Sequence, residues 1–208
     1  METYIILAYQ FAAVLLPCVV VYALLRGRGK HESGAAAGRL PLVLLLAAYF
    51  CAVFYLTGSG TLYDLLRHGL ELERANINWL PFSHDISLVG YVLNVVLFLP
   101  LGFLLPVIWP CMRSLGRVAL SGLSVSLLIE LSQLLNPRSS DVDDLLMNTL
   151  GAVLGYLAFR VLAGLLLRRD VKRTPAGKGA PELYIAALFL GNFLLYNEMG
   201  IAGLLYGF

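Results

Sequence analysis

The chain has 208 residues, of which 59% are hydrophobic and only 13% are charged, about half the usual charged share. A soluble domain of this length could not bury so much apolar surface, and a net charge of +2 provides no basic field that would attract nucleic acid. The composition also excludes intrinsic disorder and a disulfide-stabilised scaffold. The sequence therefore predicts an integral membrane protein.

Six uninterrupted apolar runs are long enough to cross a hydrocarbon core of about 30 Å. Because they lack the alternating pattern of barrel strands, their backbone hydrogen bonds must be satisfied within helices. The predicted spans are Tyr4 to Leu25, Leu40 to Thr57, Leu88 to Trp109, Leu115 to Leu135, Leu145 to Leu167 and Leu183 to Tyr206. The predicted fold is all-α, a polytopic transmembrane helical bundle of about six spans.

The chain divides into three predicted segments. Residues 1–39 hold the first span and a basic loop, residues 40–167 hold a core of spans two to five, and residues 168–208 hold a basic linker and the sixth span. Eleven of the fifteen lysines and arginines fall in the first, third and fifth loops, and three fall in the second and fourth. This asymmetry places the first set of loops in the cytoplasm and both termini outside.

The second loop, 58–87, contains an amphipathic segment. Leucines at 62, 65, 66 and 70 fall on one side of a helix, and charged residues fall on the other. Such a helix would lie in the membrane interface between spans two and three. Trp79 and Phe82 follow it around a proline. This aromatic pair is either an interfacial anchor or a lip over a site, and the sequence does not separate the two.

Polar residues inside the spans are costly in lipid unless they find a partner or line a cavity. Asn94, Glu130 and Asn148 lie on three different spans at one depth, in the outer half of the bilayer. Ser126 and Gln133 share a helical stripe with Glu130. These residues therefore mark a candidate site.

The fifth span carries a polar stripe at its outer end and a smooth face below it. Asp144 and Asn148 are four residues apart, and Gly151 and Gly155 continue the same face. The two glycines would let a neighbouring helix approach closely.

The loop before this span is short and acidic. Ser140 or Asp141 can cap the helix, and Asp143 and Asp144 favour its positive N-terminal end. Capping alone explains neither Arg138 nor Glu130. A carboxylate in an apolar run must be protonated, paired or placed in a polar cavity, and Arg138 is the nearest plausible partner of Glu130. The pair is either a buried structural contact or part of a site for a polar head group.

Together these motifs resemble the VanZ-like family over about residues 40–167. The resemblance rests on Asn78-Trp79-Leu80-Pro81-Phe82, on Asn94 to Phe103, on Glu130-Leu131-Ser132-Gln133, on Arg138, on Asp141 to Asp144, and on Asn148-Thr149-Leu150-Gly151. It implies a bacterial plasma-membrane protein similar to the founding member, which raises resistance to teicoplanin-type glycopeptide antibiotics. The family pattern carries over to Asn94, Glu130, Gln133, Arg138, Asp141, Asp144 and Asn148.

The leading hypothesis is a membrane protein, without a cofactor or a metal, whose outward-facing cavity binds an amphiphile. The expected partners are membrane lipids, including a lipid-linked envelope precursor, or the lipid tail of a lipoglycopeptide, and no nucleic acid. The predicted ligand-binding residues are Asn94, Glu130, Gln133, Arg138, Asp144 and Asn148 beneath the lip of Trp79 and Phe82.

The alternative is an enzyme that hydrolyses or transfers a lipid head group at the outer face. Glu130 would act as general base, with Asp144 or Asp141 beside it, and Arg138 would stabilise developing charge. No established catalytic motif supports this interpretation. A transporter or channel has less support, since only Pro100 and Pro106 interrupt a span noticeably.

Overall fold

The computed structural model describes residues 2–28, 40–68, 77–78, 80–82, 87–135, 140–167, 180–198, 200 and 203. Almost all of these residues are helical, which confirms the predicted all-α fold. Within the described ranges, five helical stretches are long and apolar enough to cross a membrane: Tyr4–Leu25, Leu40–Arg67, Leu88–Ile108, Leu115–Gln133 and Val142–Leu165. The second stretch consists of two helices separated at Gly58. The chain packs into two compact units, residues 1–70 with 183–208, and residues 71–182.

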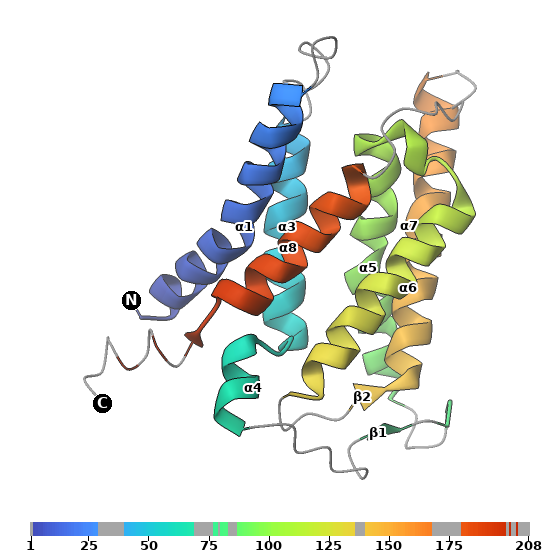
Figure 1. The fold of residues 1–208 in the computed structure, drawn as a ribbon. Helices are drawn as coiled ribbons and strands as arrows, with labels where there is room; N and C mark the ends of the chain where they lie inside the picture. The colour runs from blue at the N-terminus through green and yellow to red at the C-terminus, as the bar shows by residue number, and fades with distance from the viewer. Residues whose placement is uncertain are drawn as a thin grey trace. The chain divides into compact units, whose positions relative to one another are not determined.

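The first unit contains α1 (Glu2–Arg28), α3 (Leu40–Thr57), α4 (Leu62–His68) and α8 (Ala180–Leu195) (Figure 1). Helix α3 ends at Gly58, whose φ of 61° lies in the left-handed region that stops helices. Helix α4 then begins with a reciprocal cap, in which the Asp64 carboxylate accepts from the Thr61 N–H at 2.8 Å and the Thr61 hydroxyl accepts from the Asp64 N–H at 3.3 Å. The helix expected in the second loop is thus present over 62–68, and its position in the membrane interface stays a prediction.

Neutral polar side chains hold the first unit together. Gln10 of α1 donates to the side-chain oxygen of Asn192 of α8 at 3.1 Å, and Asn192 donates to the Ser59 hydroxyl at 3.1 Å. All three side chains are buried. Helices α1 and α8 also approach closely, since a Cβ on Gly191 would lie 2.6 Å from the backbone oxygen of Ala13.

The last predicted span is longer than the helix that forms there. Helix α8 has 16 residues and ends at Leu195, well before Tyr206. The side-chain oxygen of Asn197 accepts from the N–H of Gly200 at 2.7 Å, which is how a residue caps a new helical turn. The helix therefore stops before Asn197, and α8 is shorter than the five candidate membrane spans.

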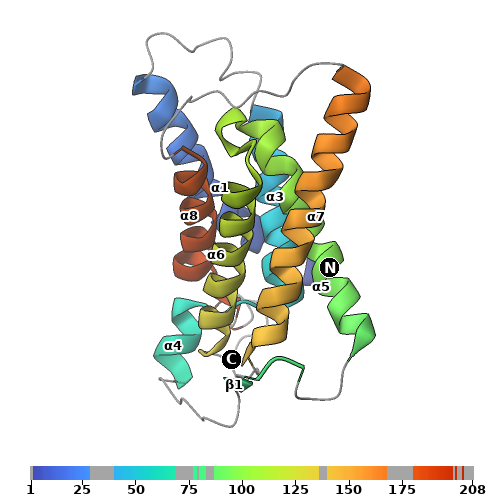
Figure 2. The ribbon, with the colours of Figure 1, turned by 90° about the vertical axis from the view of Figure 1, so that its right-hand side faces the viewer.

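The second unit is built on α5 (Leu88–Ile108), α6 (Leu115–Gln133) and α7 (Val142–Leu167), which lie side by side in both views (Figures 1 and 2). The short helix η2 (Pro110–Met112) joins α5 to α6. Two short strands, β1 (Ile77–Asn78) and β2 (Ser140–Asp141), pair in parallel at the other end. Helix α7 begins at Val142, three residues earlier than the apolar run that predicted it, because Asp141 caps it there.

Glycines allow α5 and α7 to touch backbone to backbone. A Cβ on Gly151 would lie 2.3 Å from the backbone oxygen of Val95, and a Cβ on Gly155 would lie 2.0 Å from that of Leu99. On the α5 side, a Cβ on Gly102 would lie 1.9 Å from the backbone oxygen of Ala152. This contact confirms the predicted role of Gly151 and Gly155 as a smooth helix face.

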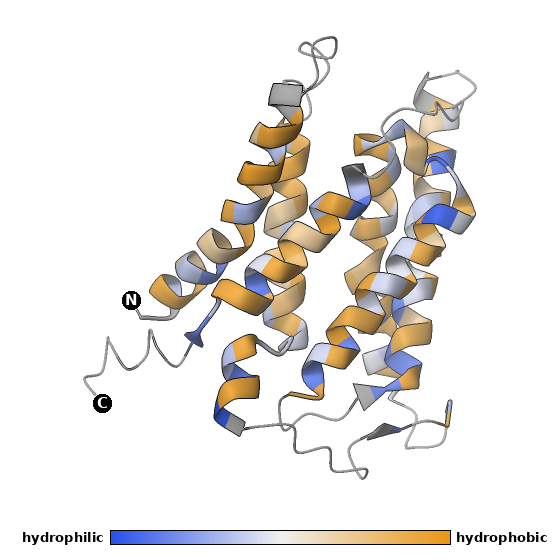
Figure 3. Ribbon diagram, in the orientation of Figure 1, coloured by the Kyte–Doolittle hydropathy of each residue, from blue (hydrophilic) through white to orange (hydrophobic). Residues whose placement is uncertain are grey.

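Apolar side chains fill the unit and cover its outside. Val118, Ala152, Tyr156, Phe159 and Ala163 form a buried cluster where α6 meets α7. Hydrophobic residues run along most of the length of the long helices (Figure 3). Leucines on the outward faces are exposed, as expected for helices whose solvent is lipid.

Candidate functional site

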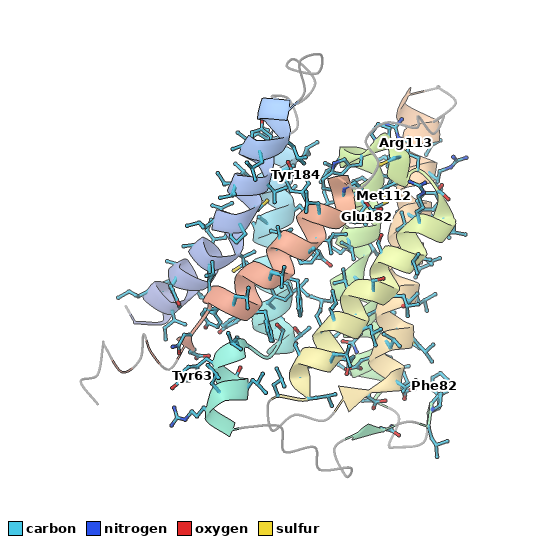
Figure 4. The ribbon with its side chains drawn as sticks, in the orientation of Figure 1. Tyr63, Phe82, Met112, Arg113, Glu182 and Tyr184 are labelled. Atoms are coloured by element: carbon cyan, nitrogen blue, oxygen red, sulfur yellow. The ribbon has the colours of Figure 1, made fainter. Side chains whose placement is uncertain are left out.

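A network of polar side chains occupies one end of the α5–α6–α7 unit. The strands β1 and β2 meet there, with Ile77 opposite Ser140 and Asn78 opposite Asp141. Figure 4 shows Phe82 at this end and Arg113 at the opposite end. We call the group of polar side chains at the Phe82 end, which comprises carboxylates, amides and one hydroxyl, the polar network: Asn78, Asn94, Ser126, Glu130, Asp141, Asp143, Asp144 and Asn148.

Asp141 connects three segments of this network. Its Oδ1 accepts from the N–H of Asp143 at 2.9 Å, which caps the first turn of α7 as the sequence indicates. The same carboxylate accepts from Nδ2 of Asn78, at 3.3 Å to Oδ1 and 3.4 Å to Oδ2. Asn78 in turn accepts from the N–H of Leu80 at 3.3 Å. The strand pairing and these side-chain contacts tie the 77–82 segment to the start of α7.

Glu130 reaches the same point from α6. Its Oε2 accepts from the backbone N–H of Asp141 at 3.1 Å. Glu130, Ser126 and Gln133 are all buried, which is consistent with the shared helical stripe expected for them. A carboxylate near the end of one helix thereby positions the residue that caps the next helix.

Asp143 is the most deeply buried of the three aspartates. Its side chain is 3% exposed and accepts from the backbone N–H of Phe82 at 3.0 and 3.1 Å and from the Tyr91 hydroxyl at 2.5 Å. Phe82 has a φ of 57°, a left-handed conformation that is costly for a bulky residue. Its ring packs edge-on against Tyr91 with centroids 5.9 Å apart. The buried carboxylate and Tyr91 together hold the strained residue in place.

Asp144 and Asn148 join α7 to its two neighbours. Asp144 accepts on Oδ1 from Nδ2 of Asn94 on α5. One turn further along, Asn148 donates from Nδ2 to the Ser126 hydroxyl of α6 at 2.9 Å. The Asn148 side chain is 3% exposed, and its Oδ1 has no hydrogen-bond partner within the part of the chain that the structure describes.

The network is rich in negative charge. It holds the carboxylates of Glu130, Asp141, Asp143 and Asp144, and the positive end of α7 offsets part of that charge. Among the described residues, the three aspartates receive hydrogen bonds from amides, backbone N–H groups and a phenol, which are all neutral donors.

The residues predicted for the site fall into two groups. The structure places Asn94, Glu130, Asp141, Asp144 and Asn148 in the polar network, with Gln133 buried on the Glu130 stripe of α6. Phe82 adjoins it through Asp143 and is 52% exposed. Arg138 and Trp79 lie outside the described residues, so the Glu130–Arg138 contact and the full aromatic lip stay predictions.

Three contributors were missed from the sequence: Asn78, Tyr91 and Asp143. Tyr91 comes three residues before Asn94 on α5, so the two share a helix face, and this spacing could have signalled it. The sequence indicates Asp143 as an acidic residue at the start of α7 and leaves open whether it does more than favour the helix end. Within the described chain, no three histidine, cysteine or acidic side chains are grouped to hold a metal ion.

A comparison with protein families gives one match to this chain. The family model described as VanZ/LLP1 matches residues 42–164, more than half of the sequence and the whole of α5 and α6. No curated protein and no solved structure matches the chain.

Proposed function

The chain belongs to the VanZ/LLP1 family, and we propose that it binds an amphiphile at the polar network, in the outer leaflet of a bacterial plasma membrane. The apolar helices make it a multi-pass membrane protein of that family. The amphiphile would be a lipid-linked cell-envelope precursor or the lipid tail of a lipoglycopeptide such as teicoplanin, in line with the resistance associated with VanZ-like proteins.

The observation that carries this proposal is a charged network bordered by lipid-facing apolar side chains. Asp144 is only half-buried, and apolar residues in the first two turns of α5, including Leu88, Val89 and Val92, are exposed. A head group could contact the carboxylates and amides while its acyl chains lie along these helices. Arg138, close to Glu130 in the sequence, would hold a phosphate or carboxylate of the same ligand.

The charge distribution along the unit supports the outward orientation. Arg113 and Arg117 lie at the end opposite the network, where Arg113 donates to the backbone oxygen of Pro106 at 3.3 Å and Arg117 to that of Cys111 at 3.4 Å. Basic residues favour the cytoplasmic side. In this proposal the acidic end faces outward, and both termini are extracytoplasmic if α8 crosses the membrane as a sixth span.

An enzyme acting on a lipid head group is the second candidate. The favouring observation is that Glu130 contacts the backbone of Asp141, which brings carboxylates from α6 and from the start of α7 to one place. Glu130 would remove a proton from a water molecule or an alcohol, with Asp144 or Asp141 nearby. Such a protein would change the mass of its lipid, whereas a binding protein would not.

Native mass spectrometry of the purified full-length chain tests the proposal. Wild-type and Glu130→Gln proteins are incubated with bacterial phospholipids, a lipid-linked envelope precursor and teicoplanin. Glu182→Gln is the matched control, because it makes the same substitution at an exposed residue in the first turn of α8. We expect the wild type and the control to retain an unaltered amphiphile and Glu130→Gln to lose it.

A lipid of changed mass formed by the wild type and not by Glu130→Gln would instead favour the enzyme. Retention of no lipid, precursor or drug by the wild type would contradict both candidates.

A further inference from the structure

Two side chains of the polar network, Asp144 and Asn148, have acceptor oxygens without a donor among the described residues. Among the described residues, Asp144 receives one hydrogen bond, from Asn94 on Oδ1, and its Oδ2 receives none. Asp144 is also half-buried, so this oxygen sits in a carboxylate that a ligand can approach. Asp141 and Asp143 lie within three residues of Asp144 and bring two more carboxylates to the start of α7. Within the part of the chain that the structure describes, Asp144 thus keeps one carboxylate oxygen without a donor.

A second unpaired acceptor lies one turn away on the same helix. Asn148 is buried in the interface between α6 and α7, where its Nδ2 donates a hydrogen bond to the Ser126 hydroxyl. Its Oδ1 has no partner in the described chain. A buried acceptor without a donor is unfavourable, because it has lost its hydrogen bonds to water and gained none in the protein. Side chains four residues apart on a helix are neighbours, so Asp144 and Asn148 can both contact one small group.

We propose that the amphiphile carries a primary ammonium group in its head group, and that Asp144 and Asn148 bind it. This inference rests on the proposed function and names the chemical class of its ligand. A primary ammonium offers three N–H donors and one positive charge in a compact group. It would supply the missing donor to Asn148 and a counter-charge to Asp144.

A primary ammonium fits the described residues better than other cations do. A metal ion would need several close ligands, and no such group of three exists among the histidine, cysteine and acidic side chains that the structure describes. A quaternary ammonium has the charge but no N–H to donate to Asn148. An aminophospholipid or an amine-bearing envelope precursor has both the donors and the acyl chains that the apolar helix faces can accommodate.

Competition between lipids with matched acyl chains tests the ammonium. Dioleoyl phosphatidylethanolamine, its N-acetyl derivative, phosphatidylcholine and phosphatidylglycerol are offered in equal amounts to the purified full-length chain, and bound lipid is read by native mass spectrometry. We expect phosphatidylethanolamine to be retained about tenfold over the other three, which corresponds to a charge-assisted hydrogen bond.

Variants assign the binding to the two residues. Asp144→Asn keeps the shape of the side chain and removes its charge, so the preference should fall close to parity. Asn148→Leu removes the buried acceptor and should weaken the preference less. Glu182→Gln also removes one negative charge but lies in the first turn of α8, so it should keep the full preference. Circular dichroism and the thermal unfolding midpoint show which variants are folded.

The outcomes separate this inference from the proposed function. Equal retention of all four lipids by the wild type, with loss in Glu130→Gln, would contradict recognition of an ammonium group. The proposal that the protein binds an amphiphile would still stand. Retention of no amphiphile of any kind would overturn both. An unchanged preference in folded Asp144→Asn would also overturn the inference. If that variant does not fold, the wild type is compared with phosphatidylethanolamine and its N-acetyl derivative, and equal retention of the two lipids would overturn the inference. Displacement of the lipid by an equal concentration of soluble phosphoethanolamine would show that the ligand is not a lipid.

Discussion

The two compact units place polar groups between apolar helices in different ways. In the first unit the polar side chains are neutral and form a chain of hydrogen bonds, in which Gln10 donates to Asn192 and Asn192 donates to Ser59. In the second unit, the acidic side chains of Asp143 and Asp144 accept hydrogen bonds from neutral donors among the described residues. Neutral hydrogen-bonded pairs of this kind hold helices together, whereas ionisable side chains between helices are costly in lipid and mark functional sites.

The glycine contacts sharpen this difference. Gly191 brings α8 against α1 in the first unit, and Gly151 and Gly155 bring α7 against α5 in the second. In the second unit the same close contact also brings Asp144 within reach of Asn94, because both pairs lie along the α5–α7 interface. Loss of that packing should therefore disturb the polar network, while loss of the first unit's contacts should not.

The largest effect is expected from Gly155→Ala. The new Cβ would lie 2.0 Å from the backbone oxygen of Leu99, so α5 and α7 must separate. We expect a loss of about 3 kcal/mol in stability, measured as a lower thermal unfolding midpoint in detergent. Gly164→Ala on the same helix is the control, since nothing lies within 4 Å of its Cβ and alanine favours helix by about 1 kcal/mol. Equal destabilisation by both substitutions would show that the contact does not matter.

A smaller effect is expected from Asp143→Asn. The amide removes the charge that holds the Phe82 N–H and the Tyr91 hydroxyl, and we expect about 2 kcal/mol of destabilisation in the same unfolding assay. Tyr91→Phe removes one of these contacts and should cost about 1 kcal/mol. In a double-mutant cycle the two losses should not add, because the residues share a hydrogen bond. Full additivity would contradict the proposed coupling.

The smallest net effect is expected in the first unit. Asn192→Leu leaves Gln10 buried with no amide partner and should cost about 1 kcal/mol of stability. The double variant Gln10→Leu and Asn192→Leu replaces both amides with apolar groups and should recover most of that loss. Lipid retention, read by native mass spectrometry, should stay at the wild-type level in both. Reduced retention in the double variant would show that the first unit also contributes to binding.

Residue patterns along the chain predicted the local features of the structure well. The run from Leu40 to Thr57 is the helix α3, and Gly151 and Gly155 form the predicted close face. Asp141 caps α7, as one of two candidates for that role. Each of these features depends on periodicity or on neighbours within a turn, which a sequence displays directly.

The contacts within the polar network could not be predicted from the sequence in the same way. Tyr91 and Asp143 are 52 residues apart, and Asn78 and Asp141 are 63 residues apart. Nothing in either local pattern shows that these residues meet. Asp143 looked like a helix-dipole residue because its neighbours Asp141 and Asp144 have the same charge and position in the loop.

The sequence by itself determined that this is a helical membrane protein with polar residues at one end of its matched core. Apolar run length and charge asymmetry are sufficient for that, because lipid forces backbone hydrogen bonds to close within each helix. Only the tertiary structure decided which polar groups meet. Pairing Asp144 with Asn94, and Asp143 with Phe82 and Tyr91, depends on which helices pack together and how each is rotated about its axis. Those rotations are fixed by backbone contact at the glycines and by burial of the whole unit, which no local pattern encodes.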